Sequence, residues 1–254
     1  MTIQVKYLLK ESIEENAELL LAEFIHDRNA SLELPIPIED IIEKHLKLRI
    51  ELDNLHQVLD VPQERLEPDI FGALWVDRRE IWVDQSLDPE ERPSIEGRYR
   101  FTLAHEVGHW CLHRTYLARD PNQTPLFTEN SQPAIVCRSS QAKERVEWQA
   151  DFYASSLLMP LAMIRDAWRD QFGEIVPYTL PQSSHMKIRG GDDGVTDATR
   201  KTLRRFQDDH KLENFVRPLA KRFQVSATAM RIRLEELGLL HRGAPRQKLL
   251  FVHT

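Results

Sequence analysis

The sequence predicts an α+β protein, with a small β-sheet in its first part and a mostly helical second part. Two observations favour this class: residues 48–52 and 70–84 have strand and hairpin patterns, and several longer stretches place apolar residues at helical spacing. The composition is typical of a folded globular protein, because 41% of the 254 residues are hydrophobic and 29% are charged. This length suits one large domain, or a medium domain with a smaller companion.

The first 84 residues are predicted to form two helices and then three strands. Residues 11–30 predict an acidic helix, and residues 38–46 predict a shorter one. Residues 48–52 alternate in polarity, which predicts a strand. Two β-rich runs at residues 71–76 and 80–83 flank a polar turn, so a β-hairpin is expected there.

Two strong helical patterns follow, over residues 97–114 and residues 142–158. Residues 115–140 between them hold three prolines and many polar side chains, so we expect a loop. From residue 197 to about residue 240 the pattern is helical again.

Composition also predicts two domains, residues 1–176 and residues 177–254, because residues 177–197 are rich in proline and glycine.

The charge is distributed unevenly along the chain. Residues 200–254 hold 13 Lys and Arg against 5 Asp and Glu, a net charge of +8. Residues 1–199 carry a net charge of −14. A basic end on an acidic body indicates either an anionic partner such as nucleic acid or a solvated basic face.

The chain has only two cysteines, Cys111 and Cys137, too few for a disulfide framework. A reducing compartment, the cytoplasm, is therefore expected. No stretch of 18 apolar residues is present, and the first residues lack the apolar core of a secretory signal, so neither a membrane span nor secretion is expected.

The segment Thr102–Trp110, TLAHEVGHW, places an H-E-x-x-H pattern on a predicted helix. His105 and His109 are four residues apart, so they project from one helical face and their imidazoles can converge on one Zn²⁺ ion. Glu106 would stand beside that metal and take a proton from water. Gly108 inside this helix predicts a close approach of another backbone.

A catalytic zinc usually has three protein ligands, so a third is needed. The position of a third metzincin histidine is occupied by Thr115, which excludes that class. His113 lies one turn beyond His109 and would have to reach back past it, so we interpret His113 as a structural or supporting residue.

A better candidate lies on the next predicted helix, where Glu147 and Asp151 share one face. One carboxylate can bind the zinc while the other orients a ligand imidazole through its free N–H. This pair after H-E-x-x-H resembles the arrangement in thermolysin-like gluzincins. Glu144, one turn earlier on nearly the same face, stays an alternative ligand.

Two further features of the site stay open. Cys137 lies ten residues before Glu147, and its thiolate is either a fourth, inhibitory zinc ligand or incidental. The group that stabilises the oxyanion is not identified by any pattern. The candidates for it are Tyr99, Tyr153, Tyr178 and His185.

Three motifs follow one another along the chain: AHEVGHWCLH, then E-x-x-A-D-x-Y-A-x-x-L-L-M-P starting at Glu147, then LAKRFQVSATAMRIRLEELGL over residues 219–239. Together they resemble the ImmA/IrrE family of zinc metallopeptidases, over about residues 35–240. The resemblance implies a zincin-like metallopeptidase core, a small sheet plus active-site helices, with a mostly helical C-terminal domain. It also implies Zn²⁺ as cofactor, metal ligands at His105, His109 and Glu147, and Glu106 as general base.

This chain departs from the family pattern at two positions. Gln149 stands where a second glutamate is frequent, which favours Glu147 as the ligand, and Asp151 stands where asparagine is common. The basic C-terminal segment resembles a helix-turn-helix in which Ser226 can cap the second helix. Gln224 in place of the turn glycine and Arg233 at an expected apolar position argue against DNA reading. Nucleic-acid binding, docking of a protein substrate and a structural cap stay open.

The resemblance further implies a zinc endopeptidase that cleaves a small helix-turn-helix transcriptional repressor and so switches on stress, DNA-damage or phage-defence genes. In zincins a sheet edge pairs with extended substrate, and we associate the hairpin at residues 71–83 with this role. The alternative is a non-proteolytic transcription regulator with a structural zinc site.

Overall fold

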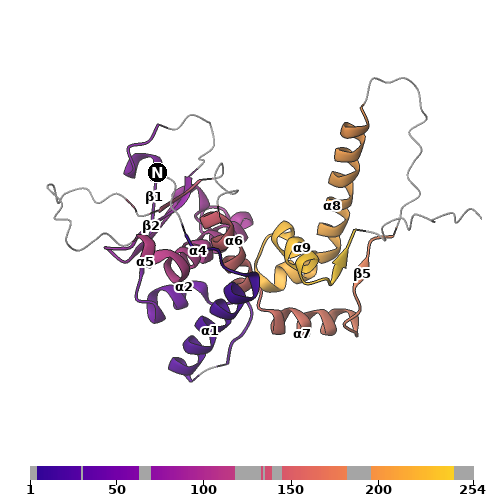
Figure 1. Ribbon diagram of the computed structural model, residues 1–254, viewed down its shortest axis with the longest axis horizontal. Helices are drawn as coiled ribbons and strands as arrows, with labels where there is room; N and C mark the ends of the chain where they lie inside the picture. Colours follow the sequence, from indigo (N-terminus) through magenta and orange to yellow (C-terminus); the bar gives the residue numbers. More distant parts are fainter. Residues whose placement is uncertain are drawn as a thin grey trace, which may run out of the picture. The chain divides into compact units, whose positions relative to one another are not determined.

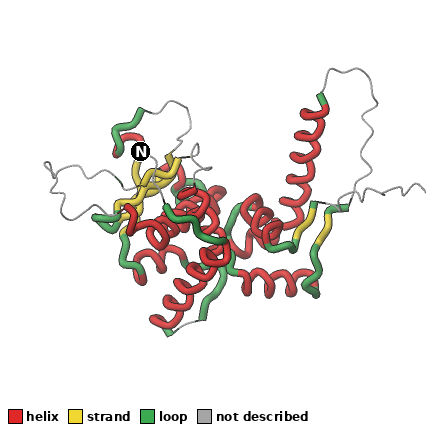
Figure 2. Tube along the Cα trace, viewed as in Figure 1, coloured by secondary structure: helices red, strands yellow, loops and turns green. Residues whose placement is uncertain are grey.

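The computed structural model has an α+β architecture, as the sequence predicts, with a four-stranded sheet among helices and then a mostly helical part (Figure 1, Figure 2). None of the helices in the described part is long and apolar enough to cross a membrane. The described residues are 5–29, 31–62, 70–117, 133, 135–138, 145–181 and 196–242.

The chain divides into two compact units. The first comprises Met1–Met163 with Lys221–Ser226, and the second comprises Ile164–Ala220 with Ala227–Thr254. The predicted division into residues 1–176 and 177–254 stays a prediction.

The first unit begins with α1 (Lys10–Arg28), whose apolar stripe is buried, as the helical pattern predicts. Asn29 ends this helix in the left-handed conformation, with a φ of 48°. Next come α2 (Ile38–Asp40) and the π-helical turn η1 (Ile41–His45), which cover the predicted short helix. The buried residues of α1 are Ile13, Ala17, Leu20, Leu21 and Phe24.

The sheet has the strand order β1-β3-β2-β4. Strands β2 (Ile70–Trp75) and β3 (Glu80–Asp84) form the predicted antiparallel hairpin, and β1 (Arg49–Asp53) pairs parallel with β3. Almost every residue of β2 and β3 is buried, because both strands lie inside the sheet. The short helices α3 (Leu55–Val58), η2 (Gln85–Leu87) and η3 (Pro93–Ile95) connect the larger elements.

The fourth strand, β4 (Ile135–Arg138), corrects the expectation of a loop over residues 115–140. It pairs antiparallel with β2, with Gly72 opposite Cys137 and Leu74 opposite Ile135. The Ile135-Val136 pair favours a strand, but four residues in a polar, proline-rich context give too weak a pattern to predict one. The ladder with β2 supplies the stability that the segment lacks by itself.

Two helices carry the site. The predicted helix at residues 97–114 is confirmed as α4 (Glu96–Gly108), continued by the π-helical turn η4 (His109–His113) and by α5 (Arg114–Leu117). The next helix, α6 (Arg145–Leu158), lies directly beside α4 (Figure 1).

Gly108 explains why these two helices come so close. A Cβ atom at this position would lie 3.1 Å from both the Cα atom and the carbonyl oxygen of Ala150, tighter than nearly all real Cβ contacts. The close backbone approach predicted from Gly108 is therefore confirmed, and it brings the first turn of α6 within reach of the histidines on α4.

The second unit contains α7 (Leu161–Phe172), most of α8 (Asp197–Phe223), α9 (Ala227–Glu236) and a two-stranded pair, β5 (Tyr178–Thr179) with β6 (Leu240–His241). Phe215 of α8 stacks on Tyr178, with ring centroids 3.8 Å apart, and on Phe172, with centroids 5.1 Å apart. This aromatic stack ties α7 and β5 to α8.

The helix-turn-helix pattern corresponds to α8, a short turn and α9. Gln224 adopts the left-handed conformation that the usual turn glycine would supply, with a φ of 50°, and Gly238 follows α9 with a φ of 68°. Arg233 is buried, although its position is one where an apolar side chain is expected.

Candidate metal centre

Three side chains predicted to bind metal meet between α4 and α6. His105 and His109 project from consecutive turns of the α4–η4 helix, and Glu147 projects from the first turn of α6. All three are buried, at 3%, 0% and 4% relative exposure. Polar groups so deeply buried need a compensating partner, and a metal ion is one such partner.

The spacing of the ligand atoms fits one tetrahedral ion. The two Nε2 atoms of His105 and His109 are 2.9 Å apart, and those atoms lie 3.1 Å and 3.7 Å from Glu147 Oε2 and Oε1, respectively. Around Zn²⁺, with bonds of about 2.0–2.1 Å, tetrahedral ligand atoms are separated by about 3.3 Å. Two imidazoles and one carboxylate are also a donor set that zinc prefers.

The outer nitrogen of His105 has a carboxylate partner. Its Nδ1 lies 2.9 Å from Oδ1 of Asp151, which is on α6 one turn after Glu147. The hydrogen bond places the His105 ring proton on Nδ1 and leaves the Nε2 lone pair directed at the metal position. Asp151 thus lies where the sequence predicts it, beside a ligand ring.

The outer nitrogen of His109 has a different partner, His113. The two Nδ1 atoms are 3.0 Å apart, and Nε2 of His113 lies 2.9 Å from Oε1 of Gln149. The amide nitrogen of Gln149 in turn donates to the carbonyl oxygen of Lys6, at 3.0 Å. His113 is therefore directed away from the metal position, consistent with its interpretation as a supporting residue.

Glu106 is fully buried beside this cluster, and within the described residues neither of its carboxylate oxygens has a hydrogen-bond partner. Gly72 of β2 makes room for it, because a Cβ atom there would lie 2.5 Å from Glu106 Oε1. Gly72 was not among the residues predicted from the sequence, although a glycine inside a buried strand is the usual signal of a close approach. Burial raises the pKa of Glu106 to about 8.

The pKa shifts of the ligands favour the forms that bind metal. Burial lowers the pKa of His109 to about 3, so its imidazole is neutral at pH 7. Burial alone would raise the pKa of Glu147, but hydrogen bonds with His105 and His109 outweigh it and bring the pKa to about 2. A metal ion therefore displaces no proton from His109 or Glu147 near neutral pH.

Other predicted residues lie elsewhere or outside the described part. Glu144 and His185 belong to the residues that the structure does not describe. Cys137 lies in β4 opposite Gly72, but its side chain is likewise not described, so its role as an inhibitory ligand stays a prediction.

The three tyrosine candidates for oxyanion stabilisation make other contacts. Burial and a hydrogen bond with Glu39 raise the pKa of Tyr99. Tyr153 is buried next to Cys111, and burial raises its pKa as well. Tyr178 stacks on Phe215 in the second unit.

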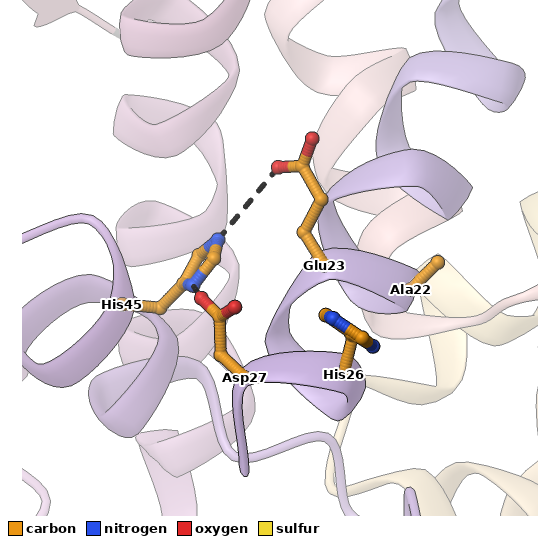
Figure 3. A pocket seen from close by; sticks show the side chains of 5 residues that line it. All are labelled: Ala22, Glu23, His26, Asp27 and His45. Atoms are coloured by element: carbon orange, nitrogen blue, oxygen red, sulfur yellow. Dashed lines mark ion pairs between the residues drawn. The ribbon is translucent and has the colours of Figure 1, made fainter. Parts of the chain in front are cut away.

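A second histidine–carboxylate cluster lies between α1 and η1, in a cavity of about 430 Å³ that His26 and Ala22 also line (Figure 3). Nδ1 of His45 is 2.9 Å from Asp27 Oδ2, while its Nε2 is 3.8 Å from Glu23 Oε2. Since the two ring nitrogens point in divergent directions, one ring cannot bring both carboxylates to one ion. In the part of the chain that is described, His105, His109 and Glu147 are the only group of three or more His, Cys, Asp or Glu side chains that could hold a metal ion.

Comparison with known proteins assigns the chain to a family. No curated protein matches the chain. Among solved structures the chain is similar to a Mycobacterium tuberculosis transcriptional regulator, with 13% sequence identity and a TM-score of 0.42; the match covers 93% of this chain and 58% of that one. The model of the IrrE N-terminal-like domain (Peptidase_M78) matches residues 57–183, half of the chain, and includes the histidine helix and α6. The chain therefore belongs to the IrrE N-terminal-like domain family.

Proposed function

We propose that this protein is a cytoplasmic zinc-dependent endopeptidase. The observation that carries the proposal is the buried cluster of His105, His109 and Glu147, with Glu106 beside it, in a chain of this peptidase family. A structural zinc site is usually closed by four protein ligands. Among the described residues only three offer ligand atoms, with a buried carboxyl group adjacent, and this arrangement favours a catalytic centre over a structural zinc in a non-proteolytic regulator.

The residues that would hold the zinc are His105, His109 and Glu147, each fixed before metal binding. The Nδ1 protons of His105 and His109 donate to Asp151 and His113, which orients the two imidazoles, and the depressed pKa of Glu147 keeps its carboxylate ionised. A bound Zn²⁺ supplies Lewis acidity, which polarises a peptide carbonyl and makes a water more acidic.

Glu106 is the proposed general base and acid. Only the ionised carboxylate can take a proton from the attacking water and return it to the leaving amine; a pKa of about 8 in the metal-free protein is close enough to neutral pH for the positive charge of a neighbouring Zn²⁺ to favour that form. Gly72 contributes by leaving the space that the Glu106 carboxyl group occupies. The complete burial of this group excludes competing solvent and strengthens its electrostatic interactions.

The strand order supports β4 as the site of main-chain pairing with an extended substrate. Both hairpin strands lie inside the sheet, so the earlier association of residues 71–83 with substrate pairing was wrong. The edge next to the catalytic centre is β4, whose neighbour β2 carries Gly72 against Glu106. A peptide added along β4 would thus run close to the general base.

For the substrate we propose a small helix-turn-helix repressor, whose cleavage switches on stress, DNA-damage or phage-defence genes. Direct DNA reading by α9 is disfavoured, because Arg231 forms ion pairs with Asp209, Glu213 and Glu235. Arg242 pairs with the first and last of these carboxylates. The second unit is therefore proposed to dock the protein substrate, with nucleic-acid binding as the alternative outcome.

The test is incubation with a small helix-turn-helix protein, chosen first from any that is encoded beside this gene, followed by mass spectrometry of the products. The zinc-loaded protein should produce a single cut, and Glu106→Gln or a chelator should abolish it. Exposed Glu91→Gln, placed in the turn before α4, is the matched control and should cleave normally. Zinc binding with no cleavage by the wild type would favour the non-proteolytic regulator instead. A salt-sensitive complex with DNA would favour nucleic acid as the partner of the second unit.

A further inference from the structure

A chain of four buried or partly buried hydrogen-bonding groups leads from the metal position to the N-terminal segment. Its members, in order, are His109, His113, Gln149 and the carbonyl group of Lys6, joined by contacts of 3.0, 2.9 and 3.0 Å. His113 and Gln149 are only 1% and 0% exposed, so solvent does not offer them alternative partners. Three segments distant in sequence, η4, α6 and residues 5–9, thus meet in one network.

The proton positions in this series of hydrogen bonds are fixed by metal binding at His109. If Nε2 of His109 binds a metal, the single ring proton must be on Nδ1, and Nδ1 donates to His113. Nδ1 of His113 is then the acceptor, so the proton of His113 is on Nε2 and donates to the Gln149 oxygen. The amide nitrogen of Gln149 is left as the donor to Lys6.

The same assignment follows from the opposite end. A backbone carbonyl only accepts hydrogen bonds, so the group of Gln149 that faces Lys6 must be its NH₂ group. Its oxygen therefore faces His113 and accepts the Nε2 proton. Whether the protons are assigned from the metal or from Lys6, each group donates to the next one in the direction of Lys6. This assignment leaves a lone pair on Nε2 of His109.

We propose that His113 and Gln149 are positioning residues that fix the ring orientation and tautomer of the ligand His109, with the N-terminal segment as their anchor. The proposal rests on the proposed metal site and adds residues to it. The two imidazoles are supported differently. His105 donates a hydrogen bond to Asp151, whose side chain is 43% exposed. His109 instead depends on neutral, buried partners, and we call the hydrogen-bonded series from His109 through His113 and Gln149 to the Lys6 carbonyl the relay. Loss of the relay would leave the buried Nδ1–H group of His109 without a hydrogen-bond acceptor.

The N-terminal segment is held on α6 independently of the relay. Val5 is buried, and the Arg145 guanidinium lies 3.5 Å from its carbonyl oxygen and 5.8 Å from the ring centre of Tyr7. These contacts place the Lys6 carbonyl against Gln149. Removal of residues 1–6 takes away the Lys6 carbonyl and should therefore weaken metal binding.

The experiment measures the zinc dissociation constant by competition with a chromophoric chelator. Gln149→Leu and His113→Phe should each raise this constant 10–100-fold, the usual effect of losing a group that orients a ligand. Ser156→Ala is the matched control, because Ser156 is a buried polar residue of α6 outside the relay, and it should change the constant by less than about two-fold. Thermal unfolding of each metal-free variant shows whether it is folded.

A second measurement needs no variant. Long-range ¹H–¹⁵N correlation spectra of the zinc-loaded wild type should show His109 protonated on Nδ1 and His113 protonated on Nε2. Unchanged zinc affinity in folded Gln149→Leu protein, or a proton on Nδ1 of His113, would overturn the relay while leaving the metal site intact. A wild-type protein that binds no zinc would overturn the proposed function and the relay together.

Discussion

The pKa of Glu106 leads to a stability prediction for the metal-free protein. The carboxyl group is fully buried, and its pKa is about 8 against an ordinary value of 4.5. In the unfolded chain it loses its proton above pH 4.5, whereas the folded protein keeps it until about pH 8. The folded state is therefore destabilised as pH rises through this window, and Glu106→Gln, which cannot ionise, should escape the loss.

The magnitude follows from about 1.4 kcal/mol per pH unit of difference between the two pKa values, or about 5 kcal/mol across the whole window. Between pH 6.5 and 8 the expected change is about 2 kcal/mol. The interval from pH 6.5 to 8 tests the Glu106 shift best, because the other shifted groups of the site do not change the stability there. These groups act only at lower pH, and they act in both proteins: the depressed pKa of His109 destabilises the fold below pH 6.5, and the stability that the depressed pKa of Glu147 contributes is lost as pH falls below 4.5.

The assay is urea unfolding with a chelator present, at pH values from 6.5 to 8.5. Tryptophan fluorescence reports mainly on the first unit, which contains Trp75, Trp82, Trp110 and Trp148. The advantage of Glu106→Gln over the wild type should grow by about 2 kcal/mol as pH rises from 6.5 to 8. Exposed Glu91→Gln should follow the wild type. Parallel pH profiles for wild type and Glu106→Gln would refute the burial argument.

Three further predictions concern neighbours of the centre. Gly72→Ala should lower kcat at least 10-fold with near-normal zinc affinity, because the added Cβ would lie 2.5 Å from Glu106 Oε1; unchanged kcat would show that the carboxyl group moves freely. Asp151→Ala should weaken zinc binding about 10–100-fold in a chelator competition, since His105 loses the acceptor of its Nδ1 proton, and an unchanged constant would exclude that role. Cys137→Ser should raise basal cleavage if the thiolate is an inhibitory ligand, and equal initial rates in the two proteins would count against it.

The site residues were predictable because their signal is local. Four residues of helix bring His105 and His109 to one face, and the same spacing relates Glu147 to Asp151. Buried helices and a buried hairpin likewise have strong periodic patterns, so α1, α4, α6 and the β2–β3 pair were predicted within a few residues of their observed ends. Gly108 also predicted a close approach of another backbone, which the structure shows to be that of α6.

Other features depend on contacts between segments far apart in sequence. Strand β4 has too few residues to show a pattern and exists through its ladder with β2. The space that Gly72 leaves for Glu106, and the bond from Gln149 to Lys6 across 143 positions, arise only when the chain folds.

The sequence by itself thus determined the candidate metal ligands, the candidate general base and the helices that carry them, because helical periodicity converts spacing along the chain directly into position in space. Only the tertiary structure decided which strand borders the candidate metal centre and which groups support each imidazole. The physical reason is that strand pairing and buried hydrogen bonds join residues whose separation along the chain is arbitrary, so no local pattern records them.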